Sequence, residues 1–227
     1  MPDIVLIAHG SPDPRHAADV ERLADAVRDR ARAGRAVGAC YLDHHAPSPD
    51  ELAAELERPA VAVPLLLTPA FHARVDIPAA VGRLRARGAD VRLAPPLGPD
   101  DRLLDACEEL LAAAGVTPDP GTAVAVFAAG SSDTAAVASI GETIERSPRR
   151  GWGHWAVAAL DGGAEIEDVV ALLRLDAERV VAVSFMVAEG ILRDRMVERC
   201  ALLGVDMVPG ALARTATLAD LVIARAL

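Results

Sequence analysis

Short apolar runs alternate with longer segments of helical spacing along this chain, and that alternation limits its fold more than any other feature. Runs rich in Val, Ile, Leu and Ala at 3–8, 36–42, 60–67 and 90–94 have the length and composition of buried strands. Strands that alternate with helices form βαβ units, and such units build parallel sheets. We therefore predict an α/β fold. The helices expected after these four strands end near residues 33, 57, 88 and 114.

The alternation stops at a segment rich in Pro and Gly, residues 115–121, and then starts again. A segment of this composition favours neither helix nor strand, so we interpret it as a linker. Ile7–Ser11 aligns with Phe127–Ser131, which indicates an internal duplication. We predict two lobes, 1–115 and 122–227. The second lobe is expected to contain strands at 122–128, 154–159, 179–185 and 205–208, with helices from about 133, over 164–173, over 190–203 and over 212–226.

Composition excludes several classes of protein. The formal charge of −10 argues against binding to nucleic acid or to an anionic membrane surface. We find no apolar run near the roughly 20 residues that a membrane-spanning helix needs, and no secretory leader. The three cysteines have no CxxC spacing, which is typical of reduced thiols. We expect a soluble, cytoplasmic protein.

Two histidines each follow a predicted strand, and they are the main candidates for function. His9 comes directly after the first strand, and His72 follows the third strand by a few residues. Ligands of open α/β sheets bind outside the carboxyl ends of the strands, so both imidazoles can face one cleft. Asp43, at the end of the second strand, is the third candidate; the alternative is that it is only a turn residue. Two imidazoles and one carboxylate with an open position suit a divalent first-row metal.

The second half of the chain lacks both histidines. Ala129 takes the position of the first, and Gly190 approximately that of the second. We therefore expect one metal site, in the first lobe. His44 and His45 are adjacent and point apart, so we expect them to be solvent-exposed. We interpret the two remaining histidines, His16 and His154, as structural.

Other functional motifs are absent from the sequence. No GxGxxG follows the first strand, no Gly-Lys of a Walker A loop is possible without lysine, and no GxSxG occurs. A strand-end histidine that carries phosphate needs Arg directly before it, and here that residue is Ala8. Nucleotide, dinucleotide and phosphohistidine chemistry are therefore disfavoured.

Three motifs in the first half of the chain resemble those of the class II tetrapyrrole chelatases, the sirohydrochlorin cobaltochelatase and ferrochelatase group. The first motif is the strand ending in His9-Gly10-Ser11. The second is Asp43, where the family usually has Glu after an aromatic-Leu pair. The third runs from Pro64 to His72 and is followed by Asp76-Ile77-Pro78. The resemblance covers residues 1–115 well and continues weakly through the second half.

The resemblance implies a fold and a site. Each lobe would be a four-stranded parallel sheet flanked by helices, with the substrate in the cleft between the lobes. His9 and His72 would be catalytic and bind the incoming metal, with Asp43 in the position of the family's acidic residue. Where the family commonly has Arg after the Ser, this chain has Pro12. The residues expected to contact substrate are Gly10, Ser11, Arg15 and Arg74.

The expected reaction is insertion of Fe²⁺, which we favour, or Co²⁺ into sirohydrochlorin, for siroheme or cobalamin biosynthesis. The metal is a substrate, no permanently bound cofactor is expected, and no ATP is needed. A polycarboxylate substrate needs a basic rim, for which Arg15, Arg74, Arg193 and Arg195 are candidates; their alternative role is ordinary solvated surface. We expect a monomer, because one chain supplies both lobes. The alternatives are a noncatalytic tetrapyrrole or metal carrier, and a structural or regulatory protein with decayed sites.

Overall fold

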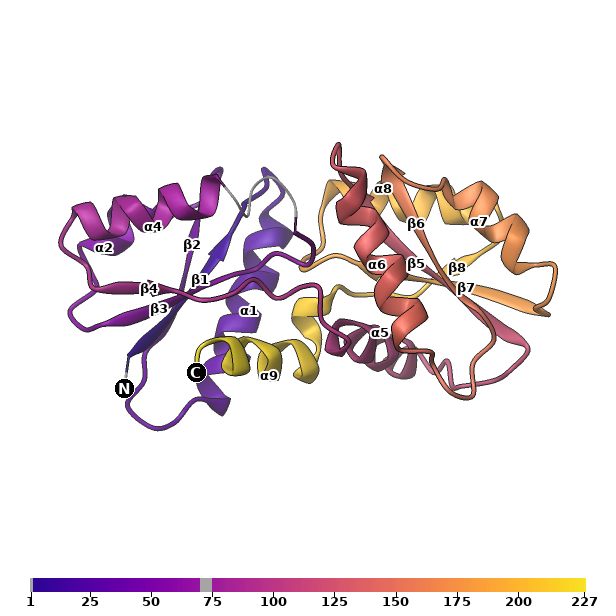
Figure 1. Ribbon diagram of the computed structural model, residues 1–227, viewed down its shortest axis with the longest axis horizontal. Helices are drawn as coiled ribbons and strands as arrows, with labels where there is room; N and C mark the ends of the chain where they lie inside the picture. Colours follow the sequence, from indigo (N-terminus) through magenta and orange to yellow (C-terminus); the bar gives the residue numbers. More distant parts are fainter. Residues whose placement is uncertain (1, 70–74) are drawn as a thin grey trace.

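Two parallel sheets form the centre of the molecule. The computed structural model describes residues 2–69 and 75–227, and within them each sheet has four strands (Figure 1). The first sheet has the order β2-β1-β3-β4 and the second the order β6-β5-β7-β8. The strands of the first sheet are β1 (Asp3–Ala8), β2 (Val37–Tyr41), β3 (Ala60–Pro64) and β4 (Val91–Leu93). Those of the second are β5 (Thr122–Gly130), β6 (Trp155–Asp161), β7 (Arg179–Phe185) and β8 (Asp206–Met207).

The two sheets have the same topology and matching register. In the first, Ile7 of β1 lies opposite Cys40 and Pro64. In the second, Phe127 of β5 lies opposite Ala158 and Ser184. The predicted α/β fold with two duplicated, four-stranded parallel lobes is therefore confirmed.

Helices follow the strands at the predicted places, with somewhat different ends. α1 stops at Arg30, short of residue 33, and α2 is a single short helix. The helix expected over 212–226 is interrupted, because the Thr215 hydroxyl accepts the Leu218 N–H and starts a new helix there. The described helices are α1 (Pro14–Arg30), α2 (Pro49–Ala53), α4 (Asp76–Ala86), α5 (Arg102–Ala113), α6 (Thr134–Arg146), α7 (Ile166–Leu173), α8 (Ile191–Leu202), the 3₁₀ turn η1 (Leu212–Arg214) and α9 (Ala216–Arg225).

Alternate side chains of each central strand enter different parts of the core. In β1, Ile4 and Leu6 join one cluster, while Val5 and Ile7 join another on the opposite face of the sheet. β5 divides its side chains in the same way between the first of these clusters and a third. Because side chains alternate between the faces of a strand, both sheets are covered on both sides. The cluster that they share is continuous from one sheet to the other.

Two helices pack across the boundary between the halves. α5 belongs to the first half by sequence, yet it packs against β7 of the second sheet. α9 ends the second half and packs against α1 and α5, on the side of the molecule that holds the first sheet (Figure 1). The limits 1–115 and 122–227 thus remain a prediction about chain segments, while the packing joins the two segments.

All three cysteines are free and buried, at Cys40, Cys107 and Cys200. Burial raises the pKa of the Cys40 thiol to about 12 and that of Cys200 to about 11, and it also raises that of Cys107. Thiolate is the reactive form, so we expect negligible labelling of the folded protein by a disulfide reagent at pH 8. Labelling of all three in denaturant is the control; a thiol that reacts at a free-cysteine rate in the folded protein would contradict this placement.

In the described part of the chain, no helix is both long enough and apolar enough to cross a lipid bilayer.

Candidate active site

A tight turn after β1 carries His9, Gly10 and Ser11, three of the site residues predicted from the sequence. The second half of the chain has the same turn after β5. The Ser11 hydroxyl accepts the Asp13 N–H at 3.2 Å, and the Asp13 carboxylate caps α1 by accepting the Arg15 N–H at 3.0 Å. After β5, Ser131 and Asp133 make the same two contacts at 3.1 Å each. Because the copy without histidine keeps the Gly-Ser pair and the cap, these residues shape the turn in both halves.

Gly10 brings the ends of β1 and β2 into contact. The Asp43 N–H donates to the His9 carbonyl at 2.9 Å. Gly10 has φ +98°, and a Cβ at this position would lie 1.9 Å from the Asp43 carbonyl oxygen. Only glycine fits such a backbone approach. The turn therefore fixes His9 next to Asp43, and both side chains are exposed.

The carboxyl ends of four strands surround a cavity of about 280 Å³ between the two sheets. Its lining is mainly apolar and comes from both halves, and the described lining residues include no arginine. His9 and His16 supply the imidazoles of its wall. The strand ends contribute Ala8, Leu65, Ala128 and Phe185.

His9 also borders a second cavity, of about 340 Å³, on the first half alone. Its described wall contains two carboxylates, Asp43 and Asp76, together with Arg83. Asp76 is the first residue of α4. Of the described residues, His9 alone lines both cavities. One side chain thus connects an apolar space with a space that contains carboxylates.

Two of the predicted site residues, His72 and Arg74, lie outside the described residues. Within the described ranges 2–69 and 75–227, no three His, Cys, Asp or Glu side chains are close enough to hold a metal ion. The structure therefore places His9 and Asp43 together and does not address the second imidazole.

Beside His9, a second pair of histidines forms a feature that the sequence interpretation missed. The His16 and His45 rings are parallel within 6°, with centroids 6.5 Å apart, and Tyr41 packs against both. His45 is thus half-buried and not exposed as predicted, whereas His44 is exposed. Burial lowers the pKa of His16, and so do the neighbouring His45 and His9. The position of His16 in the first turn of the helix after the His9 turn was the available signal.

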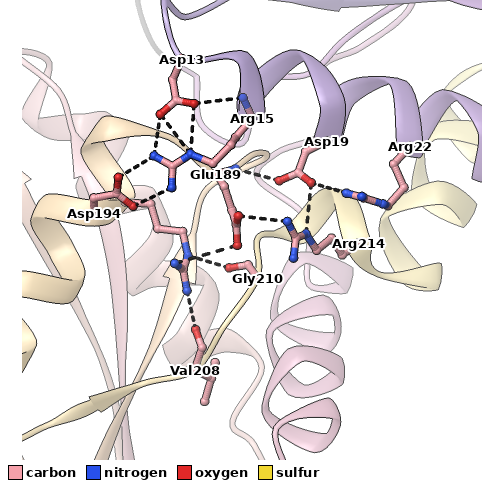
Figure 2. A network of polar contacts seen from close by, with 10 residues as sticks. Asp13, Arg15, Asp19, Arg22, Glu189, Asp194, Val208, Gly210 and Arg214 are labelled. Atoms are coloured by element: carbon pink, nitrogen blue, oxygen red, sulfur yellow. Dashed lines mark hydrogen bonds and ion pairs between the residues drawn. The ribbon is translucent and has the colours of Figure 1, made fainter.

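Two of the arginines expected at a basic rim, Arg15 and Arg193, make other contacts. Arg15 pairs with Asp13 and, across the halves, with Asp194 (Figure 2). Arg193 is buried and donates to the carbonyls of Val208 and Gly210. Arg195 is exposed. The contact between Arg15 and Asp194 joins residues 179 apart in the chain, so local sequence patterns could not reveal it.

Several known proteins are similar to this chain in sequence or in fold. Residues 3–114 match the CbiX family model. A curated sirohydrochlorin cobaltochelatase of Priestia megaterium is 26% identical over 218 residues, covering 92% of this chain; the chain spans 62% of that relative's length. SirB from Bacillus subtilis, solved with Fe³⁺, has a TM-score of 0.78 at 18% identity, covering 99% of this chain and 94% of SirB.

A further solved structure is CbiX, described as the terminal enzyme for biosynthesis of siroheme in denitrifying bacteria. It has a TM-score of 0.66 at 21% identity, and 98% of each chain is covered. At these identities the solved structures establish the fold. The two duplicated parallel lobes of this chain, which line one cavity between them, therefore have the fold of these chelatases. The match to the family model shows that residues 3–114 belong to the CbiX/SirB-like family of class II chelatases, and the curated relative extends the likeness over 92% of the chain.

Proposed function

We propose that this chain is a sirohydrochlorin chelatase, which inserts a divalent first-row metal into the tetrapyrrole without a nucleotide. The observation that supports this most directly is the position of His9 between the two cavities. The apolar cavity suits part of a macrocycle face, and the wall with Asp43 suits a hydrated cation. The cobaltochelatase name of the curated relative supports the same substrate class.

The residues at this position can supply what metallation needs. The reaction replaces two pyrrole protons with one divalent metal, and it releases the protons and the metal's water ligands. An imidazole can bind the metal on one side of the macrocycle, and a carboxylate can help to remove its water. The two packed halves of the chain form the walls of the cavity, and these walls orient the macrocycle against the metal-binding imidazole. In this proposal His9 binds the metal together with His72, and Asp43 assists.

We favour Fe²⁺ over Co²⁺ as the metal substrate, by a narrow margin. Sites with nitrogen and oxygen ligands bind divalent metals in an order of affinity determined mainly by the metal. The supply of each metal in the cell therefore also helps to determine which metal is inserted. We further propose a monomeric, cytoplasmic enzyme with no permanently bound cofactor. The free, buried thiols support a reducing compartment.

The experiment that tests this function is steady-state metallation of sirohydrochlorin with Fe²⁺, Co²⁺ and Ni²⁺ in parallel, followed by absorbance. An enzyme releases many metallated products per chain. The alternative, a noncatalytic carrier, binds tetrapyrrole or metal stoichiometrically and never exceeds one product per chain. Absence of turnover with all three metals would reject the chelatase assignment.

Asp43 allows a graded test of the carboxylate. We expect Asp43→Asn to lower kcat/KM for the metal about tenfold, which corresponds to ~1.4 kcal/mol of transition-state stabilisation. Asp43→Glu keeps the charge and has the acid usual in the family, so we expect activity within about threefold of the parent. Since Asp43 is exposed, neither change should alter the melting temperature measurably. Equal activity of both variants would show that the carboxylate takes no part.

A further inference from the structure

A carboxylate-rich ligand needs cations, and the cavity between the halves offers none from arginine in its described lining. The chain contains no lysine, and its net charge is −10. Among the described residues, the arginines that can meet the peripheral carboxylates of a tetrapyrrole therefore lie outside this lining.

Arg15 is held by two carboxylates at once (Figure 2). Toward Asp13, its Nε lies 3.1 Å from both carboxylate oxygens and its Nη2 lies 2.6 Å from Oδ2. Toward Asp194, Nη1 and Nη2 donate at 3.1 and 2.5 Å. All three nitrogens of the guanidinium thus bind carboxylate, and the Asp194 side has the two-pronged geometry that any carboxylate can adopt.

This pair lies close to the cavity between the halves, because His16, the residue after Arg15, is part of the cavity's lining. Asp13 starts α1 directly after the turn that carries His9. Across the gap, a Cβ on Gly190 would lie 3.7 Å from the Asp13 Cβ and 3.8 Å from the Ser11 hydroxyl. Ala188, two residues before Gly190, lines the cavity itself. Arg15 is therefore within a few residues of both walls.

The rest of the polar network differs from this pair in having a buried carboxylate at its centre. Asp19 is 1% exposed and accepts from Arg22, from Arg214 and from the Glu189 N–H (Figure 2). Removing one partner of such a buried charge is strongly destabilising, so this part of the network holds the halves together.

Arg15 and Asp194, in contrast, each have 46% of the side chain exposed. Exposed ion pairs contribute little to stability, so a ligand carboxylate can replace one at small cost.

We propose that Asp194 occupies, in the ligand-free protein, the position that a peripheral carboxylate of the tetrapyrrole takes on Arg15. This inference rests on the proposed function. Binding exchanges one carboxylate for another on the same guanidinium face, while Asp13 continues to orient Arg15 from the other side. Asp194 is then a competitor that weakens binding of the substrate, and it is not a support for the fold.

The test compares Asp194→Asn with Asp220→Asn. Asp220 of α9 makes an ion pair at 3.2 Å with Arg30, at the other end of α1, and its side chain is 67% exposed. Both variants remove one negative charge and one exposed ion pair between α1 and the second half of the chain. We measure the Kd of metal-free uroporphyrin, an octacarboxylate, by fluorescence quenching, and the KM for sirohydrochlorin.

We expect Asp194→Asn to bind the porphyrin about three- to tenfold more tightly than the parent, and Asp220→Asn to match the parent. Arg15→Gln should weaken binding, and the double variant Arg15→Gln/Asp194→Asn should bind no more tightly than Arg15→Gln alone. If Asp194→Asn binds no more tightly than Asp220→Asn, the exchange is wrong, even when metallation proceeds. Tight binding by Asp194→Asn without any metallation by the parent would instead reject the chelatase function and support the exchange.

Discussion

Replacing His9 with alanine should lower the rate of sirohydrochlorin metallation at least about 100-fold, a loss of ~2.7 kcal/mol in transition-state stabilisation. His9 is the one described side chain that lines both cavities, so no other described side chain can replace its proposed contact with an incoming metal. The side chain is exposed, and its removal should change the free energy of unfolding by no more than about 0.5 kcal/mol. The measurement is kcat/KM for the metal, with the melting temperature recorded on the same samples.

The matched control is His154→Ala. His154 is also exposed, and it lies beside β6 in the second half, away from both cavities that His9 borders. We expect this variant to metallate at the parental rate. We expect His72→Ala to resemble His9→Ala, on the resemblance of the sequence alone. Parental activity in both the His9 and the His72 variants would reject the proposed mechanism.

A methyl group at Gly10 should destabilise the protein and separate the side chains of His9 and Asp43. The Cβ would lie 1.9 Å from the Asp43 carbonyl oxygen, and the residue has a φ that L side chains rarely adopt. Forcing apart the backbone contact and accepting this φ should lower the free energy of unfolding by roughly 2–4 kcal/mol. Because the turn positions His9 against Asp43, we also expect the KM for the metal to rise at least about tenfold.

The internal duplication supplies the control for this prediction. At Gly130 a Cβ would lie 1.8 Å from the Asp161 carbonyl oxygen, with φ +91°. Gly130→Ala should therefore lose a similar free energy of unfolding. Gly130 lines the cavity between the halves, but its turn carries Ala129 where the first turn carries His9, so no proposed metal ligand moves with it. Its KM for the metal should equal that of the parent. Denaturant titration and metal-dependent kinetics on both variants check this, and an equal rise in metal KM would show that the effect is general loosening.

The sequence allowed correct prediction of the features that depend on local pattern. Strand β7 was predicted with its observed limits, because a Val-rich run between turns has one interpretation in an α/β chain. The adjacency of His9 and Asp43 followed from parallel strands, whose carboxyl ends meet at one edge of a sheet.

Features that depend on distant packing were not predictable in this way. The apolar stripes of α5 and α9 show that each helix packs against something, but they do not identify the sheet that it covers. The inward position of His45 depends on contacts with Tyr41 and His16, and alternation along the turn does not encode them. The Arg15–Asp194 contact spans 179 positions, and no periodicity in a single sequence records it.

The crossing of α5 and α9 has a consequence for how the cleft can move. In a protein of two lobes joined by one linker, the lobes can swing apart about that linker, and the gap between them widens freely. Here each half holds a helix of the other against its own core, and the central apolar cluster runs through both. A large rotation of one half would disrupt this shared core, so the proposed tetrapyrrole would enter through small shifts of the residues at the rim of the cleft. We therefore expect the two sheets to keep a fixed separation and movement to be limited to the turns and side chains at the rim of the cleft.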